Sequence, residues 1–368
     1  MKRLPAPPKS KQPDYRRIAE EFRLQITGGK WAPLTQLPAT PKLATAWKTS
    51  YFTIHKALQV LVKEGWIERV RGAGTYVAEP KTRFTCAAIY ESIDLTSNEE
   101  AGYDRSVIRE LKAELGRLGK EIRLFPDSRP VELQTTVLPE LAEAILHRHV
   151  QCVICQPANG FSEKAISALP VPVVFPHSYA NSPNSVGFEL EYSIERGADL
   201  LRGYGCRSIG FIHNFRRSTD SCDPYSFTTS FRKAAFHAGL KVREEWIRCP
   251  DETPQVLQRF GYRQFHALWK LRRKPDGLLI YPDHVAMGAM MAILEIGMRE
   301  VTSQMKFVFY RNAHMRFPCP FPVTWAISDE AQVARAMVET IQRQFAGEKV
   351  STVLLPYQFT ESPVISDE

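Results

Sequence analysis

The chain has 368 residues, of which 44% are hydrophobic and 24% are charged; these are values of a folded globular protein and exclude wholesale disorder. This length exceeds one ordinary domain and suits a small module followed by a larger, two-lobed part of about 280 residues. No apolar run approaches the roughly 18 residues of a membrane span, and the N-terminus lacks the apolar core of a signal peptide. We therefore expect a cytoplasmic protein without a membrane partner, whose seven cysteines, an odd and scattered number, stay reduced.

The positive charge is concentrated at one end of the chain. Residues 1–80 hold 14 Lys or Arg against 6 Asp or Glu, whereas the remaining 288 residues hold 34 of each sign, so the whole net charge of +8 lies in the first part. A basic block on a neutral body favours phosphate contact by one end of the molecule. A solvated basic tail is the alternative.

The N-terminal region predicts a flexible arm and then three helices. Residues 1–10 are rich in Pro and Lys and form the expected arm. From Asp14, apolar residues recur at helical spacing until Gly28-Gly29 stops the run. Thr40-Pro41 predicts an N-cap and the start of a short second helix. Ser50 predicts the cap of a third helix, whose expected buried stripe is Ile54, Ala57, Leu58, Leu61 and Val62.

A hairpin is expected after the third helix. Residues 66–70 and 75–77 are rich in strand formers, and the glycines of residues 71–74 permit a tight turn between them. Three helices and a hairpin make a winged helix over residues 11–78, in which the third helix enters the major groove and the wing lies along the backbone. The residues expected to contact DNA are Lys42, Thr49, Ser50, Tyr51, Thr53, His55, Lys56, Arg71 and Gly74.

Residues 15–77, from "YRRIAEEFRLQITGGKW" to "TSYFTIHKALQVLVKEGWIERVRGAGTYV", resemble the DNA-binding domain of the GntR family from end to end. The family typically has LPSER before its second helix and SRTTV at the start of its recognition helix. Here Pro41 and Tyr51 replace the two arginines of those motifs, so the resemblance implies the fold together with an unusual operator. A winged helix that serves only as a protein-interaction module is the alternative; the surplus positive charge, His55, Lys56 and Arg71 favour DNA.

After a linker at residues 79–85, short apolar strands alternate with amphipathic helices over residues 86–368. This alternation predicts parallel sheets covered by helices on both faces. Ligands of such sheets bind beyond the carboxyl ends of the strands, and between two facing lobes a ligand can close the hinge. The expected strands are 86–90, 121–125, 152–156, 171–175, 208–213, 277–281, 306–310 and 325–327.

Segments such as "IERGADLLRGYGCRSIGFIHN" and "PDGLLIYPDHVAMGAMMAILEIG" resemble the effector domain of the LacI family, clearly from about residue 186 and more weakly over residues 85–185. The resemblance implies an α/β, two-lobed periplasmic-binding-protein-like domain, preceded here by the small α+β winged-helix domain. A GntR-type head on a LacI-type body is similar to the arabinose-repressor-like regulators. These bind an operator in double-stranded DNA as homodimers, and a sugar or sugar derivative changes their affinity for it.

The effector-binding residues typical of that family are replaced at three positions of this sequence. Its cleft arginine falls at Phe227, its asparagine at Pro282 and its aspartate at Arg311, so the usual forked partners of sugar hydroxyls are absent. Arg311 favours an anionic effector, such as a sugar phosphate or acid. Other strand-end groups expected to bind the effector are Tyr90, Gln156, His213, Asn214, Asp283 and Asn312. The plainer alternatives are a helix cap for Asp283 and an ordinary loop histidine for His213.

No motif in the sequence indicates catalysis, a metal site or a cofactor. Cys152 and Cys155 have CxxC spacing inside an apolar strand, where positions three apart face opposite sides, and no second pair completes a zinc site. GxSxG, HExxH and GxxxxGKS/T are all absent. We therefore predict a transcription regulator, expected to be a repressor, and no enzyme. The alternatives are a ligand-binding protein with a protein-interaction head, and a regulator with an aminotransferase-derived body, which would need more residues and a lysine for pyridoxal phosphate.

Overall fold

The computed structural model describes residues 14–27, 30–78, 85–91, 102–156, 160–176, 183–215, 227–252 and 254–361. The expected arm, the Gly28-Gly29 stop, nearly all of the linker and Cys222 lie outside these ranges. The chain divides into two compact units. The first comprises Met1–Asn98, Leu111–Phe175 and Met337–Val350, and the second comprises Glu99–Glu110, Pro176–Ala336 and Ser351–Glu368.

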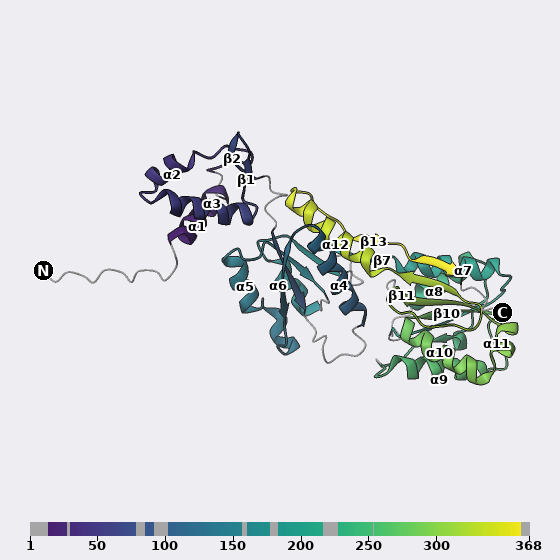
Figure 1. The fold of residues 1–368 in the computed structure, drawn as a ribbon. Helices are drawn as coiled ribbons and strands as arrows, with labels where there is room; N and C mark the ends of the chain where they lie inside the picture. The colour runs from purple at the N-terminus through teal and green to yellow at the C-terminus, as the bar shows by residue number, and fades with distance from the viewer. Residues whose placement is uncertain are drawn as a thin grey trace. The chain divides into compact units, whose positions relative to one another are not determined.

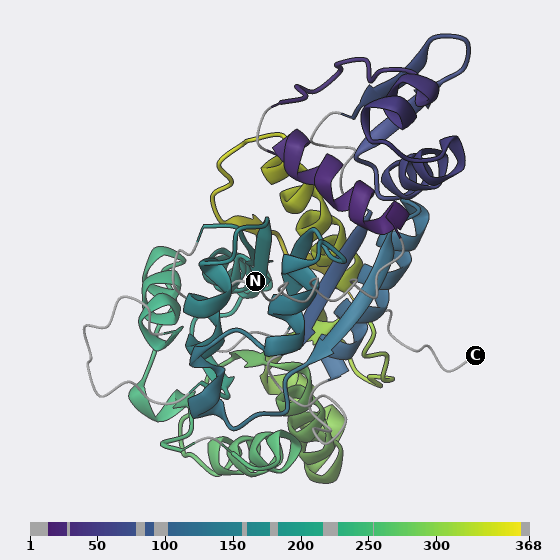
Figure 2. The same ribbon diagram turned by 90° about the vertical axis from the view of Figure 1, so that its left-hand side faces the viewer.

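The first unit begins with the predicted three helices and hairpin (Figure 1). They are α1 (Asp14–Thr27), α2 (Thr40–Ala46), α3 (Tyr51–Lys63) and the antiparallel strands β1 (Ile67–Val70) and β2 (Gly74–Val77). One apolar cluster joins them, in which Phe22 of α1 stacks on Trp47 at a centroid distance of 5.0 Å. Figure 2 shows the hairpin extending beyond the helices of this module. The winged-helix prediction is confirmed.

Two details of that prediction are wrong. Thr40 is not the N-cap of α2: Ala39 holds that position without a side-chain cap, and Thr40 and Pro41 lie inside the first turn. Val62 is not part of the buried stripe of α3, because it is 37% exposed while Leu61 is fully buried. Consecutive residues are about 100° apart around a helix, so Val62 faces away from the core. The Ser50 cap is confirmed by the Thr53 N–H, which donates to Ser50 Oγ at 3.1 Å.

The remainder of the first unit has a parallel sheet in the order β6-β5-β3-β4. Its strands are β3 (Cys86–Glu91), β4 (Glu121–Pro126), β5 (Cys152–Cys155) and β6 (Val173–Pro176), with α5 (Pro139–Leu146), α6 (Gly160–Ser167) and a short 3₁₀ turn, η2 (Val131–Thr135). Both cysteines of β5 are buried, and burial raises the pKa of each thiol above its usual value. Such thiols stay protonated and pack as small apolar side chains.

The second unit has a sheet in the order β14-β12-β11-β10-β8-β9, parallel except for β14. Its strands are β8 (Ile209–His213), β9 (Ile247–Arg248), β10 (Gly277–Tyr281), β11 (Lys306–Asn312), β12 (Thr324–Ser328) and β14 (Gln358–Glu361). The helices α7 (Leu190–Gly203) and α8 (Phe227–His237) cover one face, and α9 (Leu257–Trp269) and α10 (Asp283–Ile296) cover the other (Figure 1). The strand β7 (Ser185–Phe188) pairs in parallel with β13 (Val353–Leu355).

Two further short elements are the helix α11 (Met298–Gln304) and the 3₁₀ turn η3 (Glu244–Trp246). The helices α4 (Gly102–Arg117) and α12 (Glu330–Phe345) each contain one boundary between the two units. All eight predicted strands are present, and β7, β9, β13 and β14 were not predicted. Over the described ranges, no helix has the length and apolar character that crossing a bilayer requires. The same residues hold no group of three or more His, Cys, Asp or Glu suited to a metal ion.

Candidate functional site

The start of α3 carries two exposed aromatic side chains. Tyr51 is 55% and Phe52 is 70% exposed, and the Tyr51 ring stacks on the His55 ring at a centroid distance of 6.0 Å. Ser50 and Thr53 are engaged locally, because their hydroxyls lie 2.7 Å apart while Ser50 also caps the helix. Of the residues expected to contact DNA, Lys42, Ser50, Tyr51, Lys56, Arg71 and Gly74 are exposed, and Thr49, Thr53 and His55 are half-buried.

The wing is held by a residue that the sequence did not single out. Gln36 Nε2 donates to the Ala73 carbonyl at 2.7 Å, and the Tyr76 hydroxyl donates to the same oxygen at 3.2 Å. The backbone of residues 34–37 also pairs with β2, through Leu34 N to Val77 O and Leu37 N to Thr75 O. The hairpin tip, with the exposed Arg71, is therefore fixed to the segment that precedes α2.

A charge pair joins α1 to the end of α3. Arg23 is 7% exposed, and its Nε and Nη2 atoms donate to both oxygens of Glu64 at 2.8 and 2.6 Å; Glu20 is a second partner. Burial raises the pKa of Glu64, and the hydrogen bonds and charge of Arg23 partly oppose this. The two-bond geometry fixes the orientation of α3 relative to α1.

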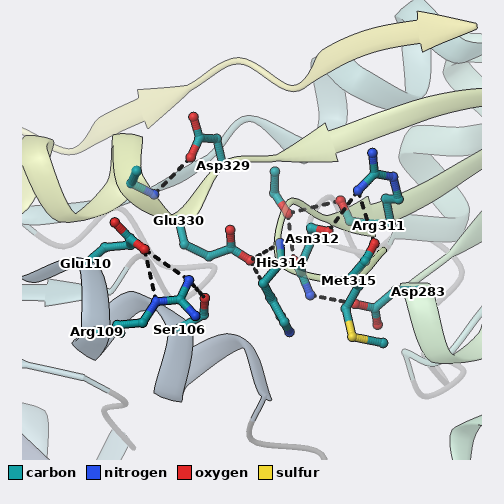
Figure 3. A network of polar contacts seen from close by, with 12 residues as sticks. Ser106, Arg109, Glu110, Asp283, Arg311, Asn312, His314, Met315, Asp329 and Glu330 are labelled. Carbon is teal, nitrogen blue, oxygen red and sulfur yellow. Dashed lines mark hydrogen bonds and ion pairs between the residues drawn. The ribbon is translucent and has the colours of Figure 1, made fainter. Parts of the chain in front are cut away.

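In the second unit, a connected set of polar side chains lies at the carboxyl ends of β10, β11 and β12 (Figure 3). Asn312 Nδ2 donates to Asp283 Oδ2 at 2.7 Å, and Ser328 Oγ donates to Asn312 Oδ1 at 2.6 Å. Asp283 is 2% exposed and also accepts the His284 N–H at 2.7 Å. Burial would raise the pKa of Asp283, but hydrogen bonds from His284 and Asn312 hold it below its usual value. Asp283, Asn312 and Ser328, with His213 and Asn214 at the end of β8, are called the strand-end site below.

A second polar pair lies beside this set in the same unit. His314 Nδ1 contacts Glu330 Oε1, and Glu330 is 3% exposed at the first residue of α12. The first turn of α4 approaches this pair, since a Cβ on Gly102 would lie 3.2 Å from His314 Nε2. Burial, Asp104 and Glu330 together raise the pKa of Tyr103 on that turn. Figure 3 shows His314 and the buried carboxylate of Glu330 next to Asn312 of the strand-end site.

Arg311 is engaged with the loop that follows β11. Its Nη1 atom donates to the Met315 carbonyl at 3.0 Å, and its guanidinium lies 5.4 Å from the centre of the Trp325 ring. Burial first, and the nearby Arg316 second, lower the pKa of Arg311. Neighbouring strand residues face opposite sides of a sheet, so Arg311 shares the side of Phe307 and Phe309, whereas Asn312 lies on the other. The expectation that Arg311 selects an anionic effector thus gains no support from its contacts.

Four aromatic rings pack against one another near these strand ends. The Phe215 ring stacks between Phe227 at 3.9 Å and Tyr281 at 5.2 Å, and Tyr281 contacts Tyr310 edge-on at 5.4 Å. Burial and Asp283 raise the pKa of Tyr281 to about 12, so its phenol remains protonated. The strand-end site therefore combines a few polar groups with apolar ring faces, as ligand sites commonly do.

Six of the eight residues expected to bind the effector belong to the second unit, and of these Asp283 and Asn312 are in direct contact. Asp283, Arg311 and Asn312 have the contacts given above. His213 is 1% exposed, its Nε2 atom lies 3.3 Å from Thr228 Oγ1, and Asn214 follows it in the chain. Phe227 packs in the apolar cluster between the sheet and the helices α7 and α8. Tyr90 and Gln156 belong to the first unit. There the Tyr90 hydroxyl donates to Asp127 at 2.6 Å, and the Gln156 N–H donates to the Tyr90 carbonyl at 2.9 Å.

Two family models match this chain. Residues 14–77 match the bacterial regulatory proteins of the gntR family, and residues 198–361 match the periplasmic binding protein-like domain. The chain combines a gntR-type helix-turn-helix module with a periplasmic-binding-protein-like domain. The two recognised resemblances of the sequence are thereby confirmed.

Relatives of known role match parts of the chain. The histidine utilization repressor of Klebsiella aerogenes is 29% identical over 126 residues, which are 34% of this chain and 46% of that protein. The repressor PurR of Actinobacillus pleuropneumoniae serotype 3 is 35% identical over 121 residues, which are 33% of each protein. The chain thus matches less than half the length of these relatives. A solved lac repressor dimer, bound to its operator and to the anti-inducer ONPF, has a TM-score of 0.56 and 19% identity over 75% of this chain and 92% of that chain; this similarity shows the two-lobed fold.

Proposed function

We propose that this protein is a transcription repressor that binds double-stranded DNA through residues 11–78 and a small effector through residues 86–368. The observation that carries the proposal is the capped, exposed start of α3 beside a basic wing tip, in a module that matches the gntR family. The named relatives are repressors of metabolic systems. A cytoplasmic location and the absence of catalytic activity accompany this role.

The effector is proposed to be a sugar or sugar derivative bound at the strand-end site. The Asp283–Asn312–Ser328 set offers hydrogen-bonding oxygens and an amide within 2.7 Å of one another. Phe215 and Tyr281, which stack on each other at 5.2 Å, are half-buried and add apolar surface at these strand ends. A homodimer with two recognition helices on one operator is the expected assembly, as in the operator-bound lac repressor dimer.

Binding of the full chain to duplexes selected from a randomised DNA pool tests the first part of this proposal. A protein that neutralises six to ten phosphates should lose about 10³- to 10⁵-fold in affinity between 50 and 200 mM salt. Weak binding that salt does not change would instead favour a head that contacts other proteins.

A thermal-shift screen of the full chain tests the effector. Matched pairs such as glucose and glucose 6-phosphate separate a neutral from an anionic preference, and a ligand at 100 times its Kd adds about 2.7 kcal/mol. Arg311→Ala should leave the affinity for a neutral hit unchanged. If that variant loses binding only for phosphorylated ligands, the result would again favour an anionic effector that Arg311 binds.

A further inference from the structure

The first turn of α3 has an unusual chemical character for a helix that faces DNA. Its four residues are Tyr51, Phe52, Thr53 and Ile54, and none of them is charged. Ile54 is buried in the core of the module, while Tyr51 is 55% and Phe52 is 70% exposed. The end of the helix that should meet base edges therefore presents two aromatic rings in place of forked cationic groups.

The hydroxyls of Ser50 and Thr53 at this end are already engaged with each other and with the helix cap. Ser50 Oγ accepts the Thr53 N–H at 3.1 Å and lies 2.7 Å from Thr53 Oγ1. The Tyr51 ring is oriented by its stack on His55, with an interplanar angle of 21°. Two-torsion aromatic side chains that are already oriented lose little conformational freedom on binding. The surface is thus preformed and mainly apolar.

Exposed cations of the same module favour DNA as the partner of this surface. They are Lys42 and Lys48 in and just after α2, Lys56 in α3 and Arg71 at the wing tip, and such side chains commonly contact phosphates. In the major groove, the apolar feature that distinguishes one base pair from the others is the 5-methyl group of thymine, and aromatic side chains contact it.

We propose that Tyr51 and Phe52 determine operator specificity by packing against thymine 5-methyl groups in the major groove. This inference rests on the proposed DNA-binding function. It predicts that duplexes selected by the full chain contain thymine at the one or two positions that face the start of α3 in each half-site.

Uracil substitution isolates the methyl group, because uracil keeps the base pairing of thymine and lacks only that group. In a selected duplex, replacing single thymines by uracil should weaken binding of the wild-type protein about five- to tenfold at these positions and leave the others unchanged. Phe52→Ala should weaken binding to the thymine duplex by a similar factor and should no longer distinguish thymine from uracil. Tyr51→Ala should do the same at a neighbouring position.

Leu24→Ala is the matched control, since Leu24 is an exposed apolar residue of α1 in the same module, with 57% of its surface exposed. It should bind both duplexes as the wild type does. Circular dichroism should show unchanged folding for all three variants, because each side chain is exposed.

The outcomes separate the two levels of the argument. Enrichment of a duplex in which uracil changes binding at no position would overturn the role of the thymine methyl groups while DNA binding stands. A Phe52→Ala protein that still distinguishes thymine from uracil as the wild type does would overturn the role of Phe52. Failure to enrich any duplex from the pool would overturn the proposed DNA-binding function and this inference with it.

Discussion

Asn312, the last residue of β11, donates a 2.7 Å hydrogen bond to the buried carboxylate of Asp283, the first residue of α10. Ser328 at the end of β12 supports the same amide from its other side. The amide orientation is thus determined by two neighbours, with Asp283 as the acceptor and Ser328 as the donor. This contact connects the carboxyl ends of three strands through one side chain, which makes the strand-end site rigid.

Acid should weaken this arrangement. Asp283 has a pKa below its usual value in the folded protein, so its ionised form stabilises the fold above the ordinary aspartate pKa of about 3.9, and that contribution is lost as the pH falls through the lowered value. The difference in melting temperature between the wild type and Asp283→Asn should therefore shrink as the pH falls below about 4. A difference that stays constant down to pH 3 would contradict this assignment.

The local features of the winged helix could be predicted from sequence because each depends on nearby residues. The Ser50 cap, the apolar spacing of α3 and the glycine turn of the wing all act within a few positions. The Gln36 contact to Ala73 could not, since it joins residues 37 positions apart. A polar residue just before a predicted second helix was the available signal, but it does not identify a partner.

The sequence predicted which strand ends contribute to the strand-end site, but it predicted only part of the orientation of the side chains there. The positions of the strand ends in the sequence singled out both Asp283 and Asn312, and the structure shows that the two side chains are in contact. Strand alternation already places Arg311 and Asn312 on opposite sides, and Trp325, which fixes Arg311, is a tertiary contact. The pair of His314 and Glu330 was missed because it is formed by a loop and a helix start 16 residues apart. Strands β9, β13 and β14 were missed because they are short and have weak alternation in burial.

The pair of Arg23 and Glu64 should matter more for the stability of the module than its position near the surface suggests. Glu64→Ala leaves a guanidinium that is 7% exposed with Glu20 as its remaining carboxylate partner, and breaking a buried pair on one side costs about 3 kcal/mol. Adding Arg23→Met should recover most of that loss, because the buried guanidinium is then absent and the remaining Glu20 carboxylate is 39% exposed and solvated. Urea unfolding of the single and double variants measures both effects; equal losses would show that the charge is not the cause.

The wing tip should depend on glycine at position 74. Gly74 has a φ of +127°, and a Cβ there would lie 2.6 Å from Gln36 Nε2, so alanine would displace the Gln36 side chain from the Ala73 carbonyl. Gly74→Ala should lower stability by about 1–2 kcal/mol and weaken DNA binding by the full chain.

Two comparisons separate backbone strain from the lost wing contact. Gly72→Ala is the matched control, because Gly72 has a φ of +78° and a Cβ there would meet nothing within 4 Å. It should retain more DNA affinity than Gly74→Ala in a fluorescence anisotropy titration. Adding Gln36→Ala to Gly74→Ala should weaken binding little further, since the same hydrogen bond is lost only once. Additive losses would show that Gln36 does not act through the wing tip.

The close approach of α9 and α10 should control the position of Asp283. A Cβ on Gly288 of α10 would lie 1.8 Å from the Gln258 carbonyl oxygen and 2.8 Å from Tyr262 N, and both are backbone atoms that cannot turn aside. Alanine there must push the helices apart, and overpacking of this kind costs about 3 kcal/mol or more. Because Asp283 begins α10, the shift should also weaken effector binding.

Gly116→Ala in α4, where a Cβ meets nothing within 4 Å, is the control. It should leave the free energy of unfolding unchanged or raise it by up to about 1 kcal/mol. Thermal unfolding of both variants, with and without a ligand from the sugar screen, measures these effects; a Gly288→Ala protein as stable as the wild type would show that the helices have room to separate.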